Sequence, residues 1–496
     1  MKAFDESGLY PYQPTPAKYL AQLLESGQNC LDGSDCGVGK TAVASAIIRH
    51  LKLPTLVLTP QINIPNWEWM GKHLGVEFDV TNVEEVRTGK SLFGRWELPK
   101  PPGPLPTELR CTQCQLVVEP EKGLPCAYGE FHCVETKKLP HRYGKFFWHP
   151  GIQFLVLDEC HKYCALDSLN ADMAIAARRQ GIRTLAISAT AADSPLGLKA
   201  LGYLLGLHSL VGEDSFYRFA FRFGCRKRIF GGLEFGRDDD DRKVKMQALH
   251  RAIFPSRGTR VRIEDLGDAF PECAITAELF DFGDAQRVNA LYATMDEALA
   301  ELQAMQLADK SPEHPFTKLI RARQALELLK TPLYAQLARD EVEAGNSVVI
   351  FVAFKATMDA LCDALGVSAR IEGGQSAALR DKTIQDYLDD KTRILVTNVD
   401  CGGTALNLPD VRGKFPRVGI ASLVYSSRKM RQLFGRLRRI TSKTKSRYRV
   451  ILAGGTKEEK IHAKMTAKLD AIDLLNDGDL LAANLPTAVV EWPEGL

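Results

Sequence analysis

The stretch GSDCGVGKT, residues 33–41, decides the fold of this chain. It follows the apolar run Asn29–Leu31 and precedes a helical pattern, TAVASAIIRHL. A glycine-rich turn between a buried strand and a helix allows backbone N–H groups to surround phosphate oxygens. This order therefore predicts a parallel α/β sheet with a phosphate-binding loop at the carboxyl end of one strand.

The residues of this loop have separate expected roles. Lys40 would reach the β- and γ-phosphates of a nucleotide, and Thr41 would bind magnesium. The expected nucleotide-binding positions of the loop are Asp35, Gly37, Val38, Gly39, Lys40 and Thr41. The full pattern has glycine where this chain has Ser34, and a simple glycine-rich turn is the alternative.

Short apolar runs alternate with helical patterns on both sides of the loop. Runs of this kind, rich in β-branched residues, are typical of buried parallel strands. They are Asn29–Leu31, Thr55–Thr59, Phe154–Leu157 and Thr184–Ile187, then Ser347–Ala353, Arg393–Thr397, Arg417–Val424 and Arg447–Ala453. The two sets predict two α/β units, which the length of 496 residues also favours.

The composition is that of an ordinary globular protein, with 45% hydrophobic and 25% charged residues. A formal net charge of +3 identifies no partner, so a nucleic-acid site would need local basic clusters. No apolar signal segment follows the polar start MKAFDESGLY, and no apolar run approaches the roughly 18 residues that span a bilayer. We expect an intracellular, cytoplasmic protein with no membrane partner.

FLVLDECHKY, residues 154–163, places two carboxylates at the end of an expected strand. Ligands of parallel sheets bind at the carboxyl ends of the strands. Asp158 would hold magnesium, and Glu159 would orient and deprotonate the attacking water. His161 could couple this site to neighbouring segments, whereas a plain acidic surface turn is the alternative.

QLFGRLRRI, residues 432–440, carries two arginines three residues apart, which would place them on one helix face. Arg436 and Arg439 could reach across a cleft to the terminal phosphate as arginine fingers. A basic surface helix is the alternative. The expected catalytic set is Lys40, Asp158, Glu159, Gln432, Arg436 and Arg439.

In this order the segments resemble the motifs of superfamily 2 helicases: GVGKT, TLVLTPQINIPNW, DECH, SAT at 188–190, VTNVDCGGTALNL and QLFGRLRR. The resemblance covers most of the chain. It implies two RecA-like lobes, one ATP and Mg²⁺ site between them, and a nucleic-acid track across both. It also implies that His161, Ser188 and Thr190 couple hydrolysis to movement.

Finer features resemble the Swi/Snf-type branch of that superfamily. PQINIPNW matches one of its segments at Asn66 and Trp67, and Gln13 in YPYQ stands like the glutamine that reads adenine. Departures include DECH instead of DEAH, and Val261 between two arginines that are usually adjacent. By this resemblance Gly403 lies near the nucleotide, and the nucleic-acid backbone contacts Thr59, Pro60, Asn66, Trp67, Gly402, Thr404 and Asn407.

The chain is expected to divide into four regions, one of which carries an insertion. They are residues 1–210 (first RecA-like lobe, with a cysteine-rich insertion at 99–150), 211–335 (mainly helical connection), 336–460 (second lobe) and 461–496 (terminal helix and tail). The proline-rich Pro99–Thr107 begins the insertion. The acidic run Asp238–Asp241 is expected to be a solvated loop.

Four cysteines, Cys111, Cys114, Cys126 and Cys133, fall within the polar insertion. CTQC has the spacing of a tetrahedral zinc knuckle, while the second pair is less regular and His132 could replace Cys133. A segment with so few apolar residues has little core, and a metal would supply the missing folding energy. We therefore expect a zinc-ribbon-like insertion, with a loop of unpaired cysteines as the alternative.

Two basic stretches are candidates for phosphate contacts. Arg428–Arg449 has ten lysines or arginines and no acid, and we expect it to serve ATP contacts, pairing in the cleft and some backbone binding. YRFAFRFGCRKR, residues 217–228, interleaves aromatic side chains, which could stack on bases but fit a helix core better.

The resemblance therefore implies an ATP-dependent translocase, favouring double-stranded DNA and remodelling of DNA or DNA–protein complexes. A helicase that separates DNA or RNA strands would have the same ATP site. A scaffold with a silent motor is a rival that the intact Lys40, Asp158, Glu159 and Arg436 argue against. A motor subunit of a restriction, repair or viral machine is a further alternative, and a bacterial or phage-infected cell is the favoured setting.

Overall fold

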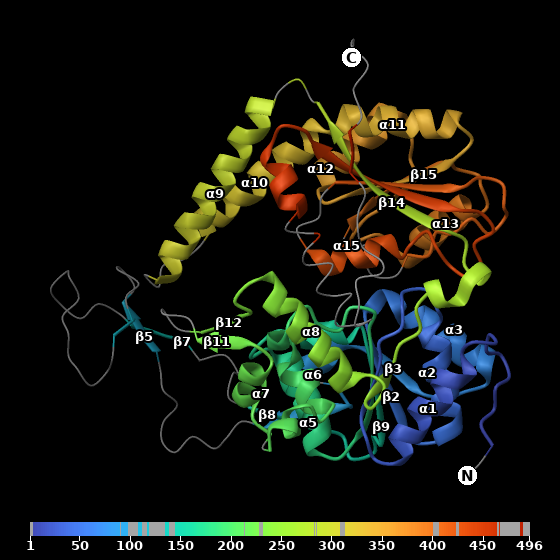
Figure 1. Cartoon of the computed structure of the whole chain (residues 1–496), viewed down its shortest axis with the longest axis vertical. Helices are drawn as coiled ribbons and strands as arrows, with labels where there is room; N and C mark the ends of the chain where they lie inside the picture. Colours follow the sequence, from blue (N-terminus) through green and yellow to red (C-terminus); the bar gives the residue numbers. More distant parts are fainter. Residues whose placement is uncertain are drawn as a thin grey trace.

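The computed structural model describes residues 3–89, 91–97, 108–111, 117–118, 134–137, 144–212, 214–227, 232–281, 283, 285–307, 313–399, 406–422, 426–463, 466 and 487–489. Two parallel sheets form two lobes. In Figure 1 the first lobe is the lower one, blue to green, and the second is the upper one, yellow to red.

The first sheet has six parallel strands in the order β13-β1-β10-β9-β2-β3. Their bounds are β1 (Cys30–Asp32), β2 (Thr55–Thr59), β3 (Asp79–Asn82), β9 (Phe154–Asp158), β10 (Arg183–Ile187) and β13 (Gly258–Thr259). The four strands expected in this half of the chain are confirmed. The short edge strands β3 and β13 were not predicted.

Helices cover both faces of this sheet because successive strand residues point to opposite sides. Val156 packs with α1 (Pro14–Glu25) and α2 (Lys40–Leu51), whereas Leu155 and Leu157 pack with the helices of the other face. Those helices are α5 (Leu169–Arg179), α6 (Lys199–Leu204), α7 (Phe216–Arg222) and α8 (Asp239–Ile253). The loop at 33–39 thus begins at the carboxyl end of β1.

The second sheet has seven parallel strands in the order β16-β17-β15-β18-β19-β14-β20. They are β14 (Cys273–Phe280), β15 (Ser347–Val352), β16 (Arg370–Ile371), β17 (Ile394–Asn398), β18 (Arg417–Ser422), β19 (Ser446–Ala453) and β20 (Thr487–Val489). Its faces are covered by α11 (Thr331–Glu343) and α12 (Lys355–Leu365) on one side, and α13 (Ala377–Leu388) and α15 (Ser427–Phe434) on the other. The expected α/β architecture with two parallel-sheet, RecA-like lobes is therefore present.

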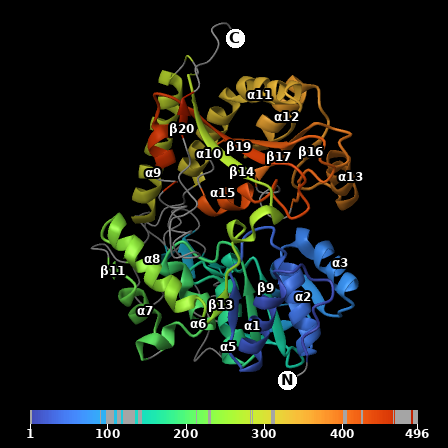
Figure 2. The same cartoon turned by 45° about the vertical axis from the view of Figure 1, so that its right-hand side comes forward.

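Residues 211–335 contribute strands to both sheets as well as helices. The first sheet receives β13 and the second receives β14, while β11 (Cys225–Lys227) and β12 (Leu233–Phe235) form a separate hairpin. Helices α9 (Ala285–Leu307) and α10 (Glu313–Leu329) pack together beside the upper lobe, as Figures 1 and 2 show.

The acidic run Asp238–Asp241 is not a loop, so that prediction was wrong. Asp238 is the N-cap of α8, and its Oδ1 accepts a hydrogen bond from the backbone N–H of Asp241 at 2.8 Å. Carboxylates at the first turn stabilise a helix by capping its N–H groups and complementing its dipole.

The insertion leaves the first lobe from β4 (Gly94–Glu97) and returns through β8 (Lys145–Trp148), which pairs antiparallel with β4. The described residues within it form three strands: β5 (Glu108–Cys111), β6 (Val117–Val118) and β7 (Val134–Lys137). The side chains of the expected zinc ligands Cys111, Cys114, Cys126, Cys133 and His132 lie outside the described residues. None of the described helices is both long and apolar enough to cross a bilayer.

Candidate nucleotide site between the two lobes

The loop between β1 and α2 curls around the ammonium group of Lys40. Gly37 and Gly39 have φ of 95° and 85°, a left-handed conformation that favours glycine. Lys40 Nζ donates to the carbonyl oxygens of Ser34 at 2.9 Å and Asp35 at 2.8 Å. The loop is therefore compact.

Gln13 holds the loop from the N-terminal side. Its buried side chain donates from Nε2 to the carbonyl of Val38 at 2.8 Å, and its Oε1 accepts from the N–H of Tyr10 at 2.8 Å. A β-carbon at Gly39 would collide with Gln13 Nε2, so a larger residue there would displace the Gln13 side chain. Thr41 is partly exposed in the first turn of α2.

Ser34, which stands where the phosphate-loop pattern has glycine, binds the segment that links the lobes. Its Oγ accepts from the N–H of Val261 at 3.1 Å. The Asp35 N–H donates to the Val261 carbonyl at 3.0 Å, and Asp35 Oδ2 accepts from the N–H of Ile263 at 3.0 Å. The sequence could not reveal these partners, since they lie more than 220 positions away.

Asp35 forms a buried ion pair with Arg260, whose Nη2 lies 2.7 Å from Asp35 Oδ1. Both side chains are less than 10% exposed. Arg260 also donates to the Gly33 carbonyl at 2.6 Å, and Arg431 of α15 approaches Asp35 Oδ1 to 3.9 Å. Burial alone would raise the pKa of Asp35, but Arg260, then Arg431, outweigh it, so the pKa lies below its ordinary value.

Asp158, at the end of β9, receives hydrogen bonds from the segment that follows β2. Its Oδ2 accepts from Thr59 Oγ1 at 2.7 Å, Trp67 Nε1 at 3.0 Å and Asn63 Nδ2 at 3.4 Å. Its Oδ1 accepts from the N–H of Glu159 at 2.9 Å. Burial, followed by the charge of Glu159, raises the pKa of Asp158, against the hydrogen bonds from Trp67 and Thr59.

Glu159 has φ of 50°, an uncommon conformation for a residue with a side chain and one that recurs at functional sites. Its Oε2 lies 3.2 Å from His161 Nδ1, which also lies 3.3 Å from Ser188 Oγ. Ser188 Oγ accepts in turn from the N–H of Thr190 at 3.1 Å. Burial would raise the pKa of Glu159, but the hydrogen bond and charge of His161 lead the opposing groups, so the pKa is lowered.

The arginines of the second lobe lie beyond a helix rather than on one, so the prediction of a shared helix face was wrong. Helix α15 ends at Phe434, and the N–H of Gly435 donates to Gln432 O at 3.2 Å in a turn. Arg436 and Arg439 follow this turn. Glycine is a weak helix former because its backbone loses more conformational freedom on folding than that of any other residue.

This turn brings the second lobe against the carboxylates of the first. Gln432 Nε2 lies 3.4 Å from Glu159 Oε2, and the charge of Arg436 contributes to lowering the pKa of Glu159. The side chains of Gln432 and Arg436 are at most 5% exposed. A β-carbon at Gly435 would lie 2.6 Å from Cys36 Cβ, so the backbone of the turn rests directly on the phosphate loop.

Arg439 lies beside the phosphate loop. A β-carbon at Gly37 would lie 2.7 Å from Arg439 Nη1, and Arg439 Nε donates to Asn407 Oδ1 at 2.8 Å. Burial, then the charge of Arg436, lowers the pKa of Arg439 to about 10. The lysine, carboxylate and arginine positions expected from the sequence therefore meet at one place.

The residues expected at the nucleic acid fall into three groups. Asn66 and Asn407 are exposed, although Asn407 binds Arg439. Thr59, Pro60 and Trp67 are buried, and Trp67, which is 0% exposed, is turned toward Asp158 and has no surface to offer a nucleic acid here. Gly402, Gly403 and Thr404 lie outside the described residues.

The two basic stretches, Arg428–Arg449 and residues 217–228, each contain residues in different surroundings. Within Arg428–Arg449, several cations pair inside the second lobe: Arg449 lies 2.6 Å from Glu278, and Lys445 lies 2.8 Å from Glu272. On α7, Phe219 is buried in the core as expected, whereas Tyr217 is 63% exposed. Aromatic side chains of this helix therefore line both its faces.

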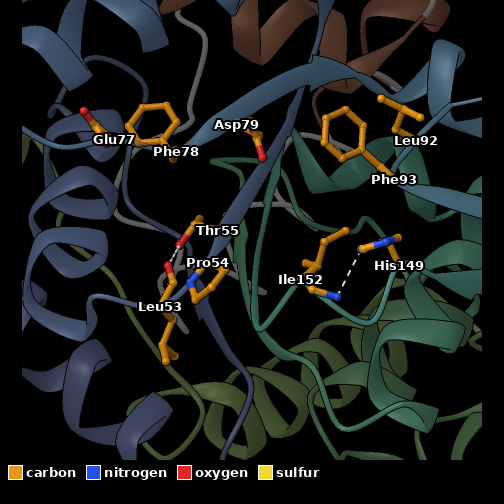
Figure 3. A pocket seen from close by; sticks show the side chains of 11 residues that line it. Leu53, Pro54, Thr55, Glu77, Phe78, Asp79, Leu92, Phe93, His149 and Ile152 are labelled. Carbon is orange, nitrogen blue, oxygen red and sulfur yellow. Dashed lines mark hydrogen bonds between the residues drawn. The ribbon is translucent and has the colours of Figure 1, made fainter.

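A cavity of about 700 Å³ lies at the opposite edge of the first sheet from the phosphate loop. Figure 3 shows its lining, which includes Pro54 and Thr55 at the start of β2 and Ile152 before β9. Because these are the amino ends of parallel strands, the cavity is separate from the candidate nucleotide site. Across the described part of the chain, no three His, Cys, Asp or Glu side chains cluster as a metal site.

Residues 327–441 match the helicase conserved C-terminal domain. A putative ATP-dependent RNA helicase of Acanthamoeba polyphaga mimivirus is 26% identical over 482 residues, covering 95% of this chain and 84% of that protein.

Two solved structures are similar at lower identity. The Sulfolobus solfataricus SWI2/SNF2 ATPase core in complex with dsDNA has a TM-score of 0.35 and 13% identity, covering 97% of this chain and 95% of that one. Dbp5 of S. cerevisiae bound to RNA and ADP BeF3 has a TM-score of 0.42 and 12% identity, covering 99% and 96%.

A phosphate loop and a carboxylate pair in one parallel-sheet lobe, facing arginines of a second, define a two-lobed ATP hydrolase. The matched C-terminal domain and the viral relative support a helicase or translocase of superfamily 2.

Proposed function

We propose that this chain is an ATP-dependent translocase that moves on double-stranded DNA and remodels DNA or DNA–protein complexes. One observation carries the proposal: Gln432 of the second lobe lies 3.4 Å from the Glu159 carboxylate of the first, and the charge of Arg436 acts on the same carboxylate. A motor needs nucleotide contacts from both lobes, so that binding and hydrolysis can change how the lobes grip a track.

The residues present suit ATP with Mg²⁺. The two glycines of positive φ allow the loop backbone to curve tightly, and Lys40 supplies an ammonium group beside it. Thr41 and Asp158 would hold Mg²⁺, which neutralises phosphate charge when bound. Gln13 and the loop positions Asp35 and Val38 would lie near the nucleotide.

Side chains around the terminal phosphate would act as base and as charge stabilisers. Glu159, whose pKa is lowered, is ionised at neutral pH and would take the proton of the attacking water. His161 and Gln432 orient its carboxylate. Arg436 and Arg439 would stabilise the charge that develops on the transferred phosphate.

The coupling of hydrolysis to movement would pass through Ser188 and Thr190. His161 lies within 3.3 Å of both the Glu159 carboxylate and the Ser188 hydroxyl. A change at the terminal phosphate can therefore be passed from Glu159 to the segment after β10. Asn66, which is exposed, and the glycine-rich segment with Gly402, Gly403 and Thr404 are the proposed backbone contacts.

The test is an ATPase assay with duplex DNA, single-stranded DNA and RNA. Stimulation by duplex DNA above the other two is the expected result, and Lys40→Ala should abolish turnover because the phosphates lose their ammonium partner. Equal rates with and without every nucleic acid would contradict the proposal.

A second candidate is a helicase that separates RNA or DNA strands. The name of the viral relative, a putative ATP-dependent RNA helicase, favours this candidate. Stronger stimulation by RNA, together with release of a labelled strand from a duplex, would select it. Co-purification with other proteins would instead support a motor subunit of a larger machine.

We also propose that Cys111, Cys114, Cys126 and Cys133, or His132 in place of Cys133, hold zinc in the insertion. The support is the C-x-x-C spacing and the polar composition of this stretch. Metal analysis of the purified chain should give about one zinc ion per molecule. A folded insertion without zinc would refute this part of the proposal.

A further inference from the structure

Helix α3 (Ile64–Leu74) places two adjacent residues in opposite environments. Asn66 is exposed to solvent, whereas Trp67 is 0% exposed. The Trp67 ring packs edge-on against Phe78, with ring centroids 5.9 Å apart. One helix therefore touches both the outside of the first lobe and the interior behind the nucleotide site.

Three donors from one short segment converge on a single oxygen atom. Thr59 Oγ1, Asn63 Nδ2 and Trp67 Nε1 all point at Asp158 Oδ2, at 2.7, 3.4 and 3.0 Å. All three belong to the stretch between the end of β2 and the second turn of α3. A shift of this segment by an ångström would therefore change all three of these hydrogen bonds.

The indole N–H is the donor that comes from α3 itself. A buried indole needs a hydrogen-bond partner, and a bond to a carboxylate is stronger than one between neutral groups. Phenylalanine would fill most of the same volume without offering a donor. Tryptophan at this position therefore links α3 to Asp158 in addition to filling the core.

We propose that Trp67, supported by Thr59 and Asn63, is a positioning residue that transmits nucleic-acid binding at the exposed side of α3 to the Asp158 carboxylate. This inference rests on the proposed function, since it requires a nucleic acid on the first lobe. In physical terms, a shift of α3 on binding moves the carboxylate that would hold Mg²⁺. Nucleic acid and Mg²⁺-nucleotide then bind with a coupling free energy that works in both directions.

The same helix supplies a matched control. Trp69 lies two residues further on, is 57% exposed, and stacks on His73 with ring centroids 4.9 Å apart. Trp67→Phe and Trp69→Phe make the same chemical change on the same helix. Only the first removes a hydrogen bond to Asp158.

The experiment measures the affinity of a fluorescent ADP analogue with and without duplex DNA, in Mg²⁺ and again in EDTA. In the wild type with Mg²⁺, DNA should tighten nucleotide binding by roughly 5- to 150-fold, the usual range of such coupling. Trp67→Phe should reduce this ratio to nearly one, while its DNA affinity without nucleotide stays at the wild-type value. In EDTA the two proteins should bind the nucleotide equally, and Trp69→Phe should keep the full ratio.

Thr59→Val removes a second donor without changing the aromatic core, and it should lower the ratio in the same direction. This variant keeps the test decisive if Trp67→Phe lowers the thermal stability. Full coupling in both variants would overturn the inference and leave the proposed function intact. A wild type that neither binds nor responds to duplex DNA, single-stranded DNA or RNA would overturn the proposed function itself.

Discussion

At the scale of single residues, the contact between the lobes depends on the glycine at position 435. Gly435 has an ordinary φ of −82°, so its backbone does not require glycine. Its packing does, because a β-carbon would lie 2.6 Å from Cys36 Cβ. The turn at Gly435 can therefore lie this close to the phosphate loop only because glycine has no β-carbon.

We expect Gly435→Ala to push the turn away from the loop and to lower kcat. A displacement of about 1 Å at a catalytic group can cost on the order of 10²-fold in rate. Removing the opposing atom in Gly435→Ala/Cys36→Gly should restore most of the loss. Steady-state ATPase assays of the two single variants and the double variant form the cycle. Additive losses would show that the two positions do not oppose each other.

At the scale of elements, the segment after β13 binds the phosphate loop and holds it in place. It contributes Val261 and Ile263 through its backbone and Arg260 through a buried ion pair with Asp35. The next arginine, Arg262, pairs with Asp265 near the surface. The two arginines therefore have different surroundings although one residue separates them.

Arg260→Met should destabilise the first lobe, because it leaves the Asp35 carboxylate buried with a weaker partner. Breaking a buried pair from one side typically costs roughly 3–5 kcal/mol. Arg262→Met should cost less than about 1 kcal/mol, as exposed pairs do. Urea denaturation of both variants compares the two losses in free energy of unfolding. Similar losses would contradict a special role of Arg260 in holding the phosphate loop.

The ion pair also predicts how stability depends on pH. The pKa of Asp35 is lower in the folded protein than its ordinary value, so its stabilisation is present above the ordinary carboxyl range, about pH 4. It is lost as pH falls through the lower, folded value. The difference in unfolding midpoint between wild type and Asp35→Asn should therefore be largest near neutral pH and shrink below about pH 4. A difference that grows on acidification would contradict this sign.

At the scale of the whole molecule, the residues proposed for catalysis are divided between lobes that have separate cores. Lys40, Asp158 and Glu159 belong to the first lobe, and Arg436 and Arg439 to the second. Variants of the second lobe should therefore lose ATP hydrolysis while the first lobe still binds ATP.

We expect Arg436→Ala to lower kcat by about 10³-fold or more, the usual worth of an arginine finger. The KM for ATP should change much less, because the phosphate loop is intact. ATPase assays over a range of ATP concentrations distinguish the two parameters. A kcat within tenfold of the wild type would argue against a role at the terminal phosphate.

Patterns confined to a short stretch of sequence were predictive across the molecule. All eight apolar runs became strands. Lys40 begins the helix after a strand, and Asp158 and Glu159 lie at the end of one, as expected, because strand, turn and residue type lie together in the sequence. Strand β13 was missed because two residues, Gly258–Thr259, carry no hydrophobic pattern.

Partners distant in the sequence were not predictable. The bond between Ser34 and Val261 joins residues 227 positions apart, and no local signal marks it. The motif that contains Trp67 also says nothing about which side of α3 the indole occupies. Its expected place at the nucleic acid differs from its buried position for that reason.

The place of β14 in the second sheet has a consequence for protein synthesis. This strand pairs in register with β19, Cys273 opposite Ser446, and its Ala277 and Phe280 are buried. On the ribosome, the strands of the first sheet are all made before β14 emerges, so that lobe can fold during translation. Strand β14 must wait, with apolar side chains uncovered, until β19 has been translated. The interval between them is when the nascent chain is most exposed to aggregation and to chaperones.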